Sequence, residues 1–321
     1  MPFALTCEGH FLCVFISSEV PGSLEISRML WHNRYNHYFQ NTTGTIMYHK
    51  VYIEITNICN MHCSFCHGHK RVPKQMRTEE FVHILDQLTR QTQYIYYHLM
   101  GEPLTHPELP SFIKMAGDRG YKSIITTNGT LLPKRGAELL SAGIHKVNLS
   151  LHSFEEGAEE DYLRYVGELA EFSKKAAEQG TIVVFRLWNK GFDGGKNAVA
   201  VKALSEFIPG DWVENTRGIK IRDKIYIEFG ERFEWPDTED EIKGTKFFCY
   251  GLKDQFGILV DGTVVPCCLD SDGVINLGNI FTQDIDTILT SRRATAMVEG
   301  FRCGKASEEL CKKCGYAQRF V

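Results

Sequence analysis

The sequence has 321 residues and a mass of 36.6 kDa, enough for one large α/β barrel-type domain with a smaller module or for two ordinary domains. Its 36 Lys and Arg against 40 Asp and Glu give a formal net charge of −4, which excludes a broad cationic surface for DNA or an acidic membrane. The eleven cysteines lie beside His, Asp and Gly rather than at disulfide-framework spacings, which indicates a reducing compartment and bound metal.

The first 46 residues lack the alternating pattern that follows them, and we treat residues 1–46 as an N-terminal extension whose role the sequence leaves open. Their apolar run GHFLCVFISSEVPG is too short to cross a bilayer, and no basic segment precedes it as in a secretion signal. We therefore expect a cytoplasmic protein that does not enter a membrane. Cys7 and Cys13 lie in this extension and receive no role.

From Val51 onward, apolar strand-like runs alternate with amphipathic helical runs, which is typical of βα units wound into a parallel sheet. Thr78, followed by two Glu residues, is the expected N-cap of the first helix, and the other helical runs end at a Gly. The predicted helical runs are 78–88, 137–143 and 162–180, and the predicted strands are 51–56, 94–99, 122–128, 146–153, 181–188 and 224–230. Residues 47–235 are thus predicted to form an α/β fold, a partial (β/α)6 TIM-like barrel.

A second module is predicted over residues 236–321. The acidic, Pro-containing stretch FEWPDTEDEIKG interrupts the alternation of strand-like and helical runs, which predicts a bridging loop. Residues 256–268 form two short β runs joined at Asp261-Gly262, which is a strong hairpin signal, and a helix is expected over 284–301. The module is therefore a β-hairpin plus a helix.

Three thiols stand at offsets of four and three in CNMHCSFCHG, at Cys59, Cys63 and Cys66. The same offsets mark one face of a helix, so a buried cysteine stripe is one interpretation. Poor helix formers surround the thiols, which favours a loop wrapped around a ligand (Thr56, Asn57, Asn60 and Ser64). Three thiolates leave a zinc site incomplete unless a nearby His completes it, whereas they can hold a four-iron cluster with one iron open (His62, His67 or His69).

This Cys-x3-Cys-x2-Cys loop after the first strand of a βα series resembles the radical S-adenosylmethionine (SAM) superfamily. Phe65 stands at the family's usual aromatic position before the third cysteine. The stretch MGEP supplies the family's motif at Gly101, Glu102 and Pro103, whose backbone and carboxylate are expected to receive the methionyl amino group. The resemblance places further S-adenosylmethionine contacts at the ends of later strands (Thr127, Asn128, Ser150 and Arg186), although Ser150 and Arg186 also suit internal hydrogen bonding.

The resemblance implies a [4Fe-4S] cluster held by the three cysteines and by S-adenosylmethionine, with flavodoxin or ferredoxin as the reductant. Reductive cleavage then yields a 5′-deoxyadenosyl radical that abstracts hydrogen from a substrate inside the barrel. The protein supplies binding and orientation, and the cofactor supplies the chemistry.

Four later cysteines form a wide pair around the hairpin, Cys249 and Cys267, and a close pair, Cys311 and Cys314. The pattern resembles the auxiliary-cluster domain called twitch, a shortened relative of SPASM, and implies one auxiliary [4Fe-4S] cluster. Structural zinc remains open for four cysteines of this kind. Cys303 and Cys268 are rival ligands, but adjacent strand residues point in opposite directions, so only one of Cys267 and Cys268 can face the site.

The substrate pocket is expected among polar residues on the predicted barrel strands, each of which also suits a structural hydrogen bond (Tyr52, Glu54, His98, His152, Arg186 and Glu228). Their mixed charge favours a small polar metabolite. The resemblance suggests dehydrogenation, as in twitch-containing aminosugar dehydrogenases, or radical C–N or C–C bond scission, as in queuine lyase. A radical SAM maturase that modifies a peptide is the alternative, and a zinc-binding module without catalysis is the third hypothesis.

Overall fold

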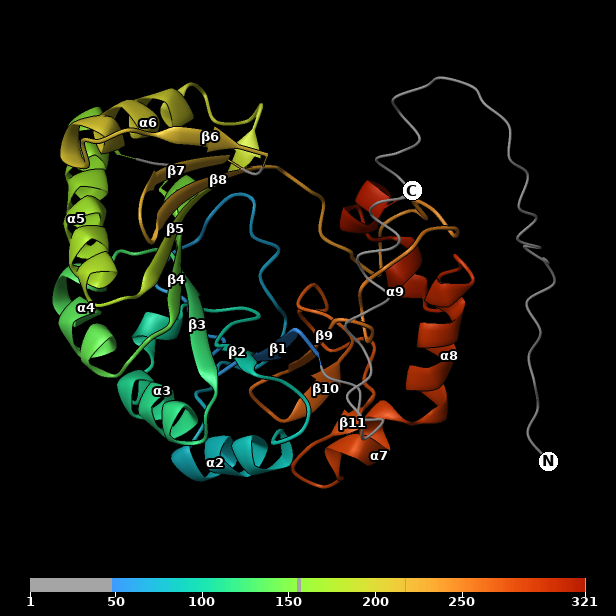
Figure 1. The fold of residues 1–321 in the computed structure, drawn as a ribbon. Helices are drawn as coiled ribbons and strands as arrows, with labels where there is room; N and C mark the ends of the chain where they lie inside the picture. Colours follow the sequence, from blue (N-terminus) through green and yellow to red (C-terminus); the bar gives the residue numbers. More distant parts are fainter. Residues whose placement is uncertain (1–47, 155–156, 217, 321) are drawn as a thin grey trace, which may run out of the picture. The chain divides into compact units, whose positions relative to one another are not determined.

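The computed structural model describes residues 48–154, 157–216 and 218–320 (Figure 1), so the predictions for residues 1–46 lie outside the described residues. The described strands form one eleven-stranded sheet in the order β11-β10-β9-β1-β2-β3-β4-β5-β8-β7-β6. This order places the last strands of the chain beside the first one.

Six neighbouring parallel strands confirm the predicted partial barrel: β1 (Lys50–Ile53), β2 (Tyr94–Tyr96), β3 (Lys122–Thr127), β4 (Lys146–Ser150), β5 (Ile182–Lys190) and β8 (Ile225–Glu231). The centres of these strands are apolar and buried, as at Val51, Val147 and Val183, which is typical of parallel strands whose outer face is covered by helices. Three short 3-10 turns follow strands or end the chain, at η1 (Pro103–Thr105), η2 (Leu151–Ser153) and η3 (Tyr316–Phe320).

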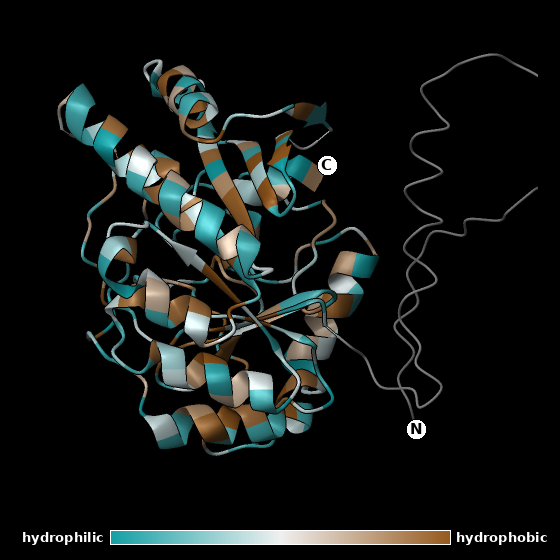
Figure 2. Ribbon diagram, turned by 60° about the vertical axis from the view of Figure 1, so that its left-hand side comes forward, coloured by the Kyte–Doolittle hydropathy of each residue, from teal (hydrophilic) through white to brown (hydrophobic). Residues whose placement is uncertain are grey.

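The covering helices are α2 (Thr78–Gln87), α3 (Leu109–Asp118), α4 (Leu132–Ser141), α5 (Glu159–Glu178) and α6 (Lys196–Phe207), which Figure 1 shows on the outer side of the strands. Figure 2 shows them banded with hydrophobic and hydrophilic residues, as expected for helices with one buried face. The N-cap of α2 is Arg77, so the prediction of Thr78 was wrong by one residue. The Glu80 carboxylate accepts the Arg77 backbone N–H at 2.8 Å, which fixes that helix start.

Two parts of the barrel carry no strong sequence signal. Helix α6 follows a Gly-rich stretch in which Gly194 and Gly195 both have positive φ, and its N-cap, Gly195, has no side chain that could cap it. Strands β6 (Val213–Asn215) and β7 (Gly218–Arg222) form an antiparallel hairpin with β8, and every residue of β6 is exposed. Without a buried face, such a strand shows no alternation of apolar and polar residues.

The predicted C-terminal hairpin is present as β9 (Gln255–Ile258) and β10 (Thr263–Val265), with Gly262 in the turn at φ 88°. Strand β9 also pairs in parallel with β1, and β11 (Gly278–Asn279) follows β10, so the hairpin extends the barrel sheet. The single helix predicted over 284–301 is two helices, α7 (Ile285–Leu289) and α8 (Arg292–Arg302), because Ser291 caps the second by accepting the Ala294 N–H. The last helix is α9 (Glu309–Lys312).

Candidate functional site

The three-cysteine segment lies between β1 and α2 as turns and extended chain, without a helix, in agreement with the loop interpretation. Cys59 and Cys66 are exposed residues, although the Cys59 thiol is partly buried, and the half-buried Cys63 donates to the Ser153 carbonyl at 3.7 Å. Burial raises the pKa of the Cys59 thiol, and the nearby Glu102 and Cys66 add to the effect. A bound cation would relieve this repulsion, so the donor set fits a metal cluster.

Asparagine side chains fasten this loop to neighbouring strand ends. Asn57 donates to the Val72 carbonyl at 2.9 Å and accepts the Lys74 N–H at 2.7 Å, which closes the base of the loop. Farther along, Asn60 accepts from the Asn128 side chain at 2.9 Å and donates to Thr130 Oγ1 at 2.9 Å. The cysteine loop is therefore held over the end of β3.

Gly101 lies against the end of β1, where only glycine fits. Its φ is +75°, and a Cβ atom there would stand 2.4 Å from the Thr56 carbonyl oxygen. The next residue, Glu102, donates its backbone N–H to the Ile58 carbonyl at 2.9 Å, and Pro103 begins η1. The motif thus pins the end of β2 to the start of the cysteine loop.

The Glu102 carboxylate is buried and joins β2 to β3. It accepts from Thr127 Oγ1 at 2.7 Å, from the Asn128 N–H at 2.8 Å and from the Leu104 N–H at 3.0 Å. Burial raises the Glu102 pKa to about 7, although the three hydrogen bonds favour the ionised form. The structure therefore brings together Gly101, Glu102, Pro103, Thr127 and Asn128 of the predicted cofactor-binding residues.

Polar side chains with spare hydrogen-bonding capacity line the barrel interior. Ser150, Arg186 and Glu228 are register neighbours across β4, β5 and β8, and Arg186 Nε lies 3.5 Å from Glu228 Oε2. The Arg186 guanidinium also lies over the Trp188 ring at 4.4 Å. The buried Nε of Arg186 and Nδ1 of His98 have no hydrogen-bond partner, so this interior can still bind a polar ligand.

His98 is held between aromatic rings of the first two strands. Its ring centroid lies 5.4 Å from that of Tyr52 and 6.1 Å from that of Tyr96. Burial, together with the charge of Arg186, lowers the His98 pKa to about 3, so the imidazole is neutral at physiological pH.

Glu54 differs from the other predicted substrate contacts because both oxygens of its carboxylate already accept hydrogen bonds from the protein. It is completely buried and accepts two hydrogen bonds from Arg71, at 2.7 and 2.6 Å, and others from the Met100 and Val260 N–H groups at 3.2 and 3.0 Å. This occupancy favours the structural hydrogen-bonding role, which is one of the two roles that the sequence leaves open for Glu54. Sequence reasoning missed Arg71, since a loop residue carries no periodic signal.

A pocket of about 230 Å³ opens beside the cysteine loop. The Phe65 and His152 rings meet on its wall, with centroids 4.8 Å apart, and His152 Nδ1 lies 3.0 Å from the Arg186 carbonyl oxygen. Trp188 and Asn189 line it from β5, and Asn189 Oδ1 is buried without a hydrogen-bond partner. This aromatic pocket with an unused amide oxygen suits a flat, hydrogen-bonding group such as a nucleobase.

The predicted auxiliary cysteines come from three segments of the C-terminal part and lie near enough to affect one another's titration. Burial raises the pKa of the Cys249 thiol to about 11 and that of Cys267 well above its usual value. Neighbouring thiols add to both effects: Cys314 and Cys268 act on Cys249, and Cys268, Cys249, Cys311 and Cys314 act on Cys267. Cys303 lies at the end of α8. The four mutually repelling thiols fit a bound cluster, although no three His, Cys, Asp or Glu side chains of the described residues converge as a single-ion site would require.

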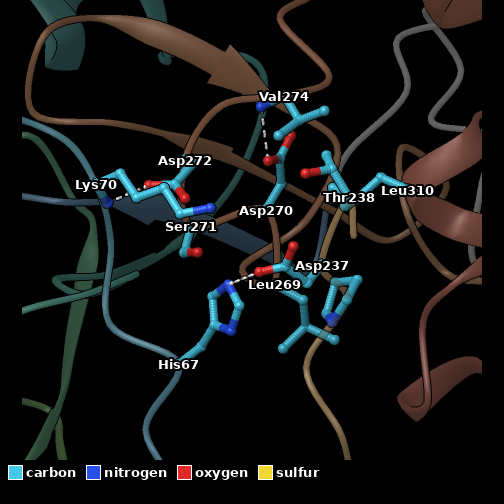
Figure 3. Close-up of a pocket in the computed structure, with 11 residues that line it drawn as sticks. His67, Lys70, Asp237, Thr238, Leu269, Asp270, Ser271, Asp272, Val274 and Leu310 are labelled. Carbon is cyan, nitrogen blue, oxygen red and sulfur yellow. Dashed lines mark hydrogen bonds and ion pairs between the residues drawn. The ribbon is translucent and has the colours of Figure 1, made fainter. Parts of the chain in front are cut away.

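Figure 3 shows a second, small pocket of about 20 Å³ where the cysteine loop meets the C-terminal part. His67 Nε2 lies 3.4 Å from Asp237 Oδ2, and the Lys70 N–H donates to Asp272 Oδ1 at 2.7 Å. Arg71 Nε also donates to the Ser271 carbonyl at 2.8 Å. The residues directly after Cys66 are thus tied to the segments on both sides of the hairpin.

Within the described residues, every helix is too short or too polar to cross a membrane.

Comparison with known proteins places two family models on the chain. The model described as "Radical SAM superfamily" matches residues 53–184, and the SPASM model, described as an "Iron-sulfur cluster-binding domain", matches residues 249–315. The two matches contain the first and second cysteine groups respectively.

Two curated relatives show different coverage. A probable GTP 3′,8-cyclase from Methanococcus maripaludis is 35% identical over 271 residues, 71% of this chain and 87% of that protein. A PqqA peptide cyclase from Bradyrhizobium diazoefficiens is 32% identical over 111 residues. This match covers 33% of this chain and only 29% of that relative's length. Among solved structures, BtrN in complex with AdoMet and 2-DOIA has a TM-score of 0.56 at 20% identity, over 84% of this chain and 94% of that one, which is a likeness of fold.

Proposed function

Because this chain belongs to the radical SAM superfamily, we propose that it uses reductive cleavage of S-adenosylmethionine to remove a hydrogen atom from a small polar metabolite inside the barrel. The first cluster, when bound, supplies the electron that cleaves S-adenosylmethionine to the 5′-deoxyadenosyl radical. The outcome for the metabolite is dehydrogenation or scission of a C–N or C–C bond.

Different residues of the chain are proposed to bind the cluster, the methionyl group and the adenine. Cys59, Cys63 and Cys66 would hold three irons, and Cys59 and Cys66 are already exposed residues. Gly101 lets the backbone of its motif approach β1, and Glu102 fixes the ends of β2 and β3 around the position expected for the methionyl group. The pocket bounded by Phe65, His152 and Trp188 suits the adenine, because it is aromatic and contains an unpartnered amide oxygen.

One observation carries the choice of substrate: the buried Nδ1 of His98 has no hydrogen-bond partner, which supports a polar ligand in the barrel. Glu228 adds a negative charge beside Arg186, so both positive and negative substrate groups can be bound. The relative that matches 71% of this chain is named for GTP, a small molecule, which supports the same choice. The PqqA peptide cyclase likeness, over one third of the chain, supports the alternative of a peptide maturase.

We also expect flavodoxin or ferredoxin to deliver the electrons and the four C-terminal cysteines to hold the auxiliary cluster (Cys249, Cys267, Cys311 and Cys314). Cys268, the residue after Cys267, packs against Tyr52 of β1, so the predicted auxiliary site lies beside the barrel strands. At this position an auxiliary cluster can hold the substrate or exchange an electron with it.

The test uses the full chain, purified without oxygen, with both clusters reconstituted, and supplied with S-adenosylmethionine and dithionite. We expect 5′-deoxyadenosine, detected by mass spectrometry, to increase when a pool of small polar metabolites is added. A deuterated metabolite should pass deuterium to it. The Cys63→Ala variant is the control and should form none. Stimulation by peptides alone would support the maturase, and a wild-type enzyme that cleaves no S-adenosylmethionine would refute the proposal.

A further inference from the structure

Phe192 stands at the mouth of the aromatic pocket that Phe65, His152 and Trp188 also line. Its ring is part of the pocket wall, yet the residue is 69% exposed. The other aromatic residues of the wall are buried or half-buried. A phenylalanine as exposed as this one gains free energy when another apolar surface covers it. The ring of Phe192 is therefore an uncovered part of a pocket that is otherwise enclosed by aromatic side chains.

Backbone hydrogen bonds on both sides hold Phe192 in this position. Its N–H donates to the Asn189 carbonyl at 2.8 Å, which closes a tight turn at the end of β5. After it, the Asp193 carbonyl accepts the Lys196 N–H at 3.0 Å, and the Asp193 carboxylate accepts the Asn197 N–H at 3.2 Å. These bonds join the turn to α6, so the ring is held beside the pocket before a ligand binds.

Arg232, the residue directly after β8, packs on the Phe192 ring. Its guanidinium carbon lies 5.5 Å from the ring centroid, within the range of a cation–π interaction, and Arg232 lines the same pocket. The pair joins the ends of β5 and β8 at the pocket mouth. A Cβ atom on Gly191 or Gly194 would meet no atom within 4 Å, so the turn that carries Phe192 faces open space.

The chemistry of the pocket indicates what kind of ligand would cover this ring. Asn189 Oδ1 is buried without a hydrogen-bond partner in the same pocket, so it favours a ligand that donates an N–H or O–H group. The aromatic walls favour a flat ring. A planar heterocycle that carries an amino group meets both requirements, and adenine has this chemistry.

We propose that Phe192 is a binding residue that stacks on the adenine of S-adenosylmethionine and closes the pocket over it. The inference rests on the proposed function, which assigns the adenine to this pocket. The adenine covers the exposed ring, and Arg232 keeps the ring in place through its own contact with it. Phe192 therefore contributes to the affinity for S-adenosylmethionine and takes no part in bond breaking.

The first experiment measures the affinity for S-adenosylmethionine by equilibrium dialysis of the full chain, purified without oxygen and with both clusters reconstituted. Phe192→Ala should weaken binding about tenfold, because the adenine loses the ring that covers it. Phe192→Tyr keeps an aromatic ring and should bind within about twofold of the wild type. Wild-type affinity in Phe192→Ala, or an equal loss in Phe192→Tyr, would overturn the inference.

Phe229→Ala is the matched control for the loss of an exposed phenylalanine. Phe229 belongs to β8 and is 40% exposed, but it does not line the pocket. Its replacement should leave the affinity for S-adenosylmethionine unchanged. The same loss in Phe229→Ala as in Phe192→Ala would show that the effect does not come from the pocket and would also overturn the inference.

The second experiment observes the ring itself and uses no activity. The full chain is prepared with para-fluorophenylalanine in place of Phe192, and its fluorine NMR resonance is recorded after reconstitution. Saturating S-adenosylmethionine should shift this resonance, because a stacked adenine changes the magnetic environment of the ring, whereas methionine, which lacks the base, should not. An unshifted resonance with S-adenosylmethionine bound would overturn the inference and leave the proposed function standing. A wild type that binds no S-adenosylmethionine would overturn both.

Discussion

Glu54 and Arg71 form a fully hydrogen-bonded ion pair at the base of the cysteine loop, with N–O distances of 2.6 and 2.7 Å and no exposure of the carboxylate. The same guanidinium donates to the Ser271 carbonyl, and the same carboxylate accepts the Val260 N–H. One pair of charges therefore joins β1, the loop that holds the first cluster, and the segments after β9 and β10.

We expect Arg71→Ala to destabilise the protein by about 3–5 kcal/mol, because it leaves the Glu54 carboxylate buried without its countercharge. The measurement is urea denaturation, with Arg77→Ala as the control. Arg77 is also paired with a glutamate, Glu80, but its side chain is 74% exposed, so a loss below about 1 kcal/mol is expected. The double variant Glu54→Gln/Arg71→Ala should recover part of the loss. An additive or larger loss in the double variant would contradict this explanation.

Replacing Gly101 should disturb the first cluster as well as the fold. In Gly101→Ala the new methyl group meets the Thr56 carbonyl at 2.4 Å, so the motif must move away from β1. We expect at least a tenfold weaker affinity for S-adenosylmethionine, measured by equilibrium binding to the reconstituted protein. Gly120→Ala is the matched control: its φ is +84°, yet nothing lies within 4 Å of the added atom, so it bears only backbone strain of about 1 kcal/mol. Equal affinities in the two variants would rule out the clash.

The buried Glu102 predicts a pH dependence with a definite sign. Its pKa is raised from 4.5 to about 7, so the folded protein holds a proton that the unfolded chain releases between these values. The stabilisation is complete below pH 4.5 and lost as the pH rises through 7. The cluster-free wild type should therefore lose about 2–3 kcal/mol between pH 5 and pH 8 relative to Glu102→Gln, whose side chain does not titrate. Parallel stability profiles of the two proteins would show that the carboxyl titrates normally.

The auxiliary site should be separable from the first one. Cys249→Ser removes one of the four thiols predicted to hold the auxiliary cluster, whose titration Cys314 affects. We expect it to lose about half of the reconstituted iron, while the reduced protein retains the electron paramagnetic resonance signal that shifts on addition of S-adenosylmethionine. Cys66→Ser is the complementary control and should lose that shift. If Cys249→Ser has the full iron content, another ligand must serve the auxiliary cluster.

The sequence predicts the six parallel strands because each is a buried apolar run bounded by turn residues. It predicts the conformation of the cysteine loop from residues such as Asn60. It does not predict that Cys267 and Cys268 lie in a bend and a turn after β10, where the alternation of strand side chains does not apply. It does not predict that Arg71 binds Glu54, because this pairing depends on the path of a loop, and a loop has no hydrophobic periodicity that could be read from the sequence. For the same reason, the contacts of His67 with Asp237, 170 residues along the chain, become visible only in the folded structure.

The parallel pairing of β9 with β1 has a consequence for how the chain folds. Residues 50–53 meet residues 255–258, so closing this ladder brings together segments separated by about 200 residues, a contact that forms slowly. Until then β1 is an edge strand, with unpaired N–H and C=O groups on the side away from β2. A strand of another molecule can pair with such an exposed edge. A shortened chain ending before β9 should therefore aggregate, even though all the strands from β1 to β8 are present.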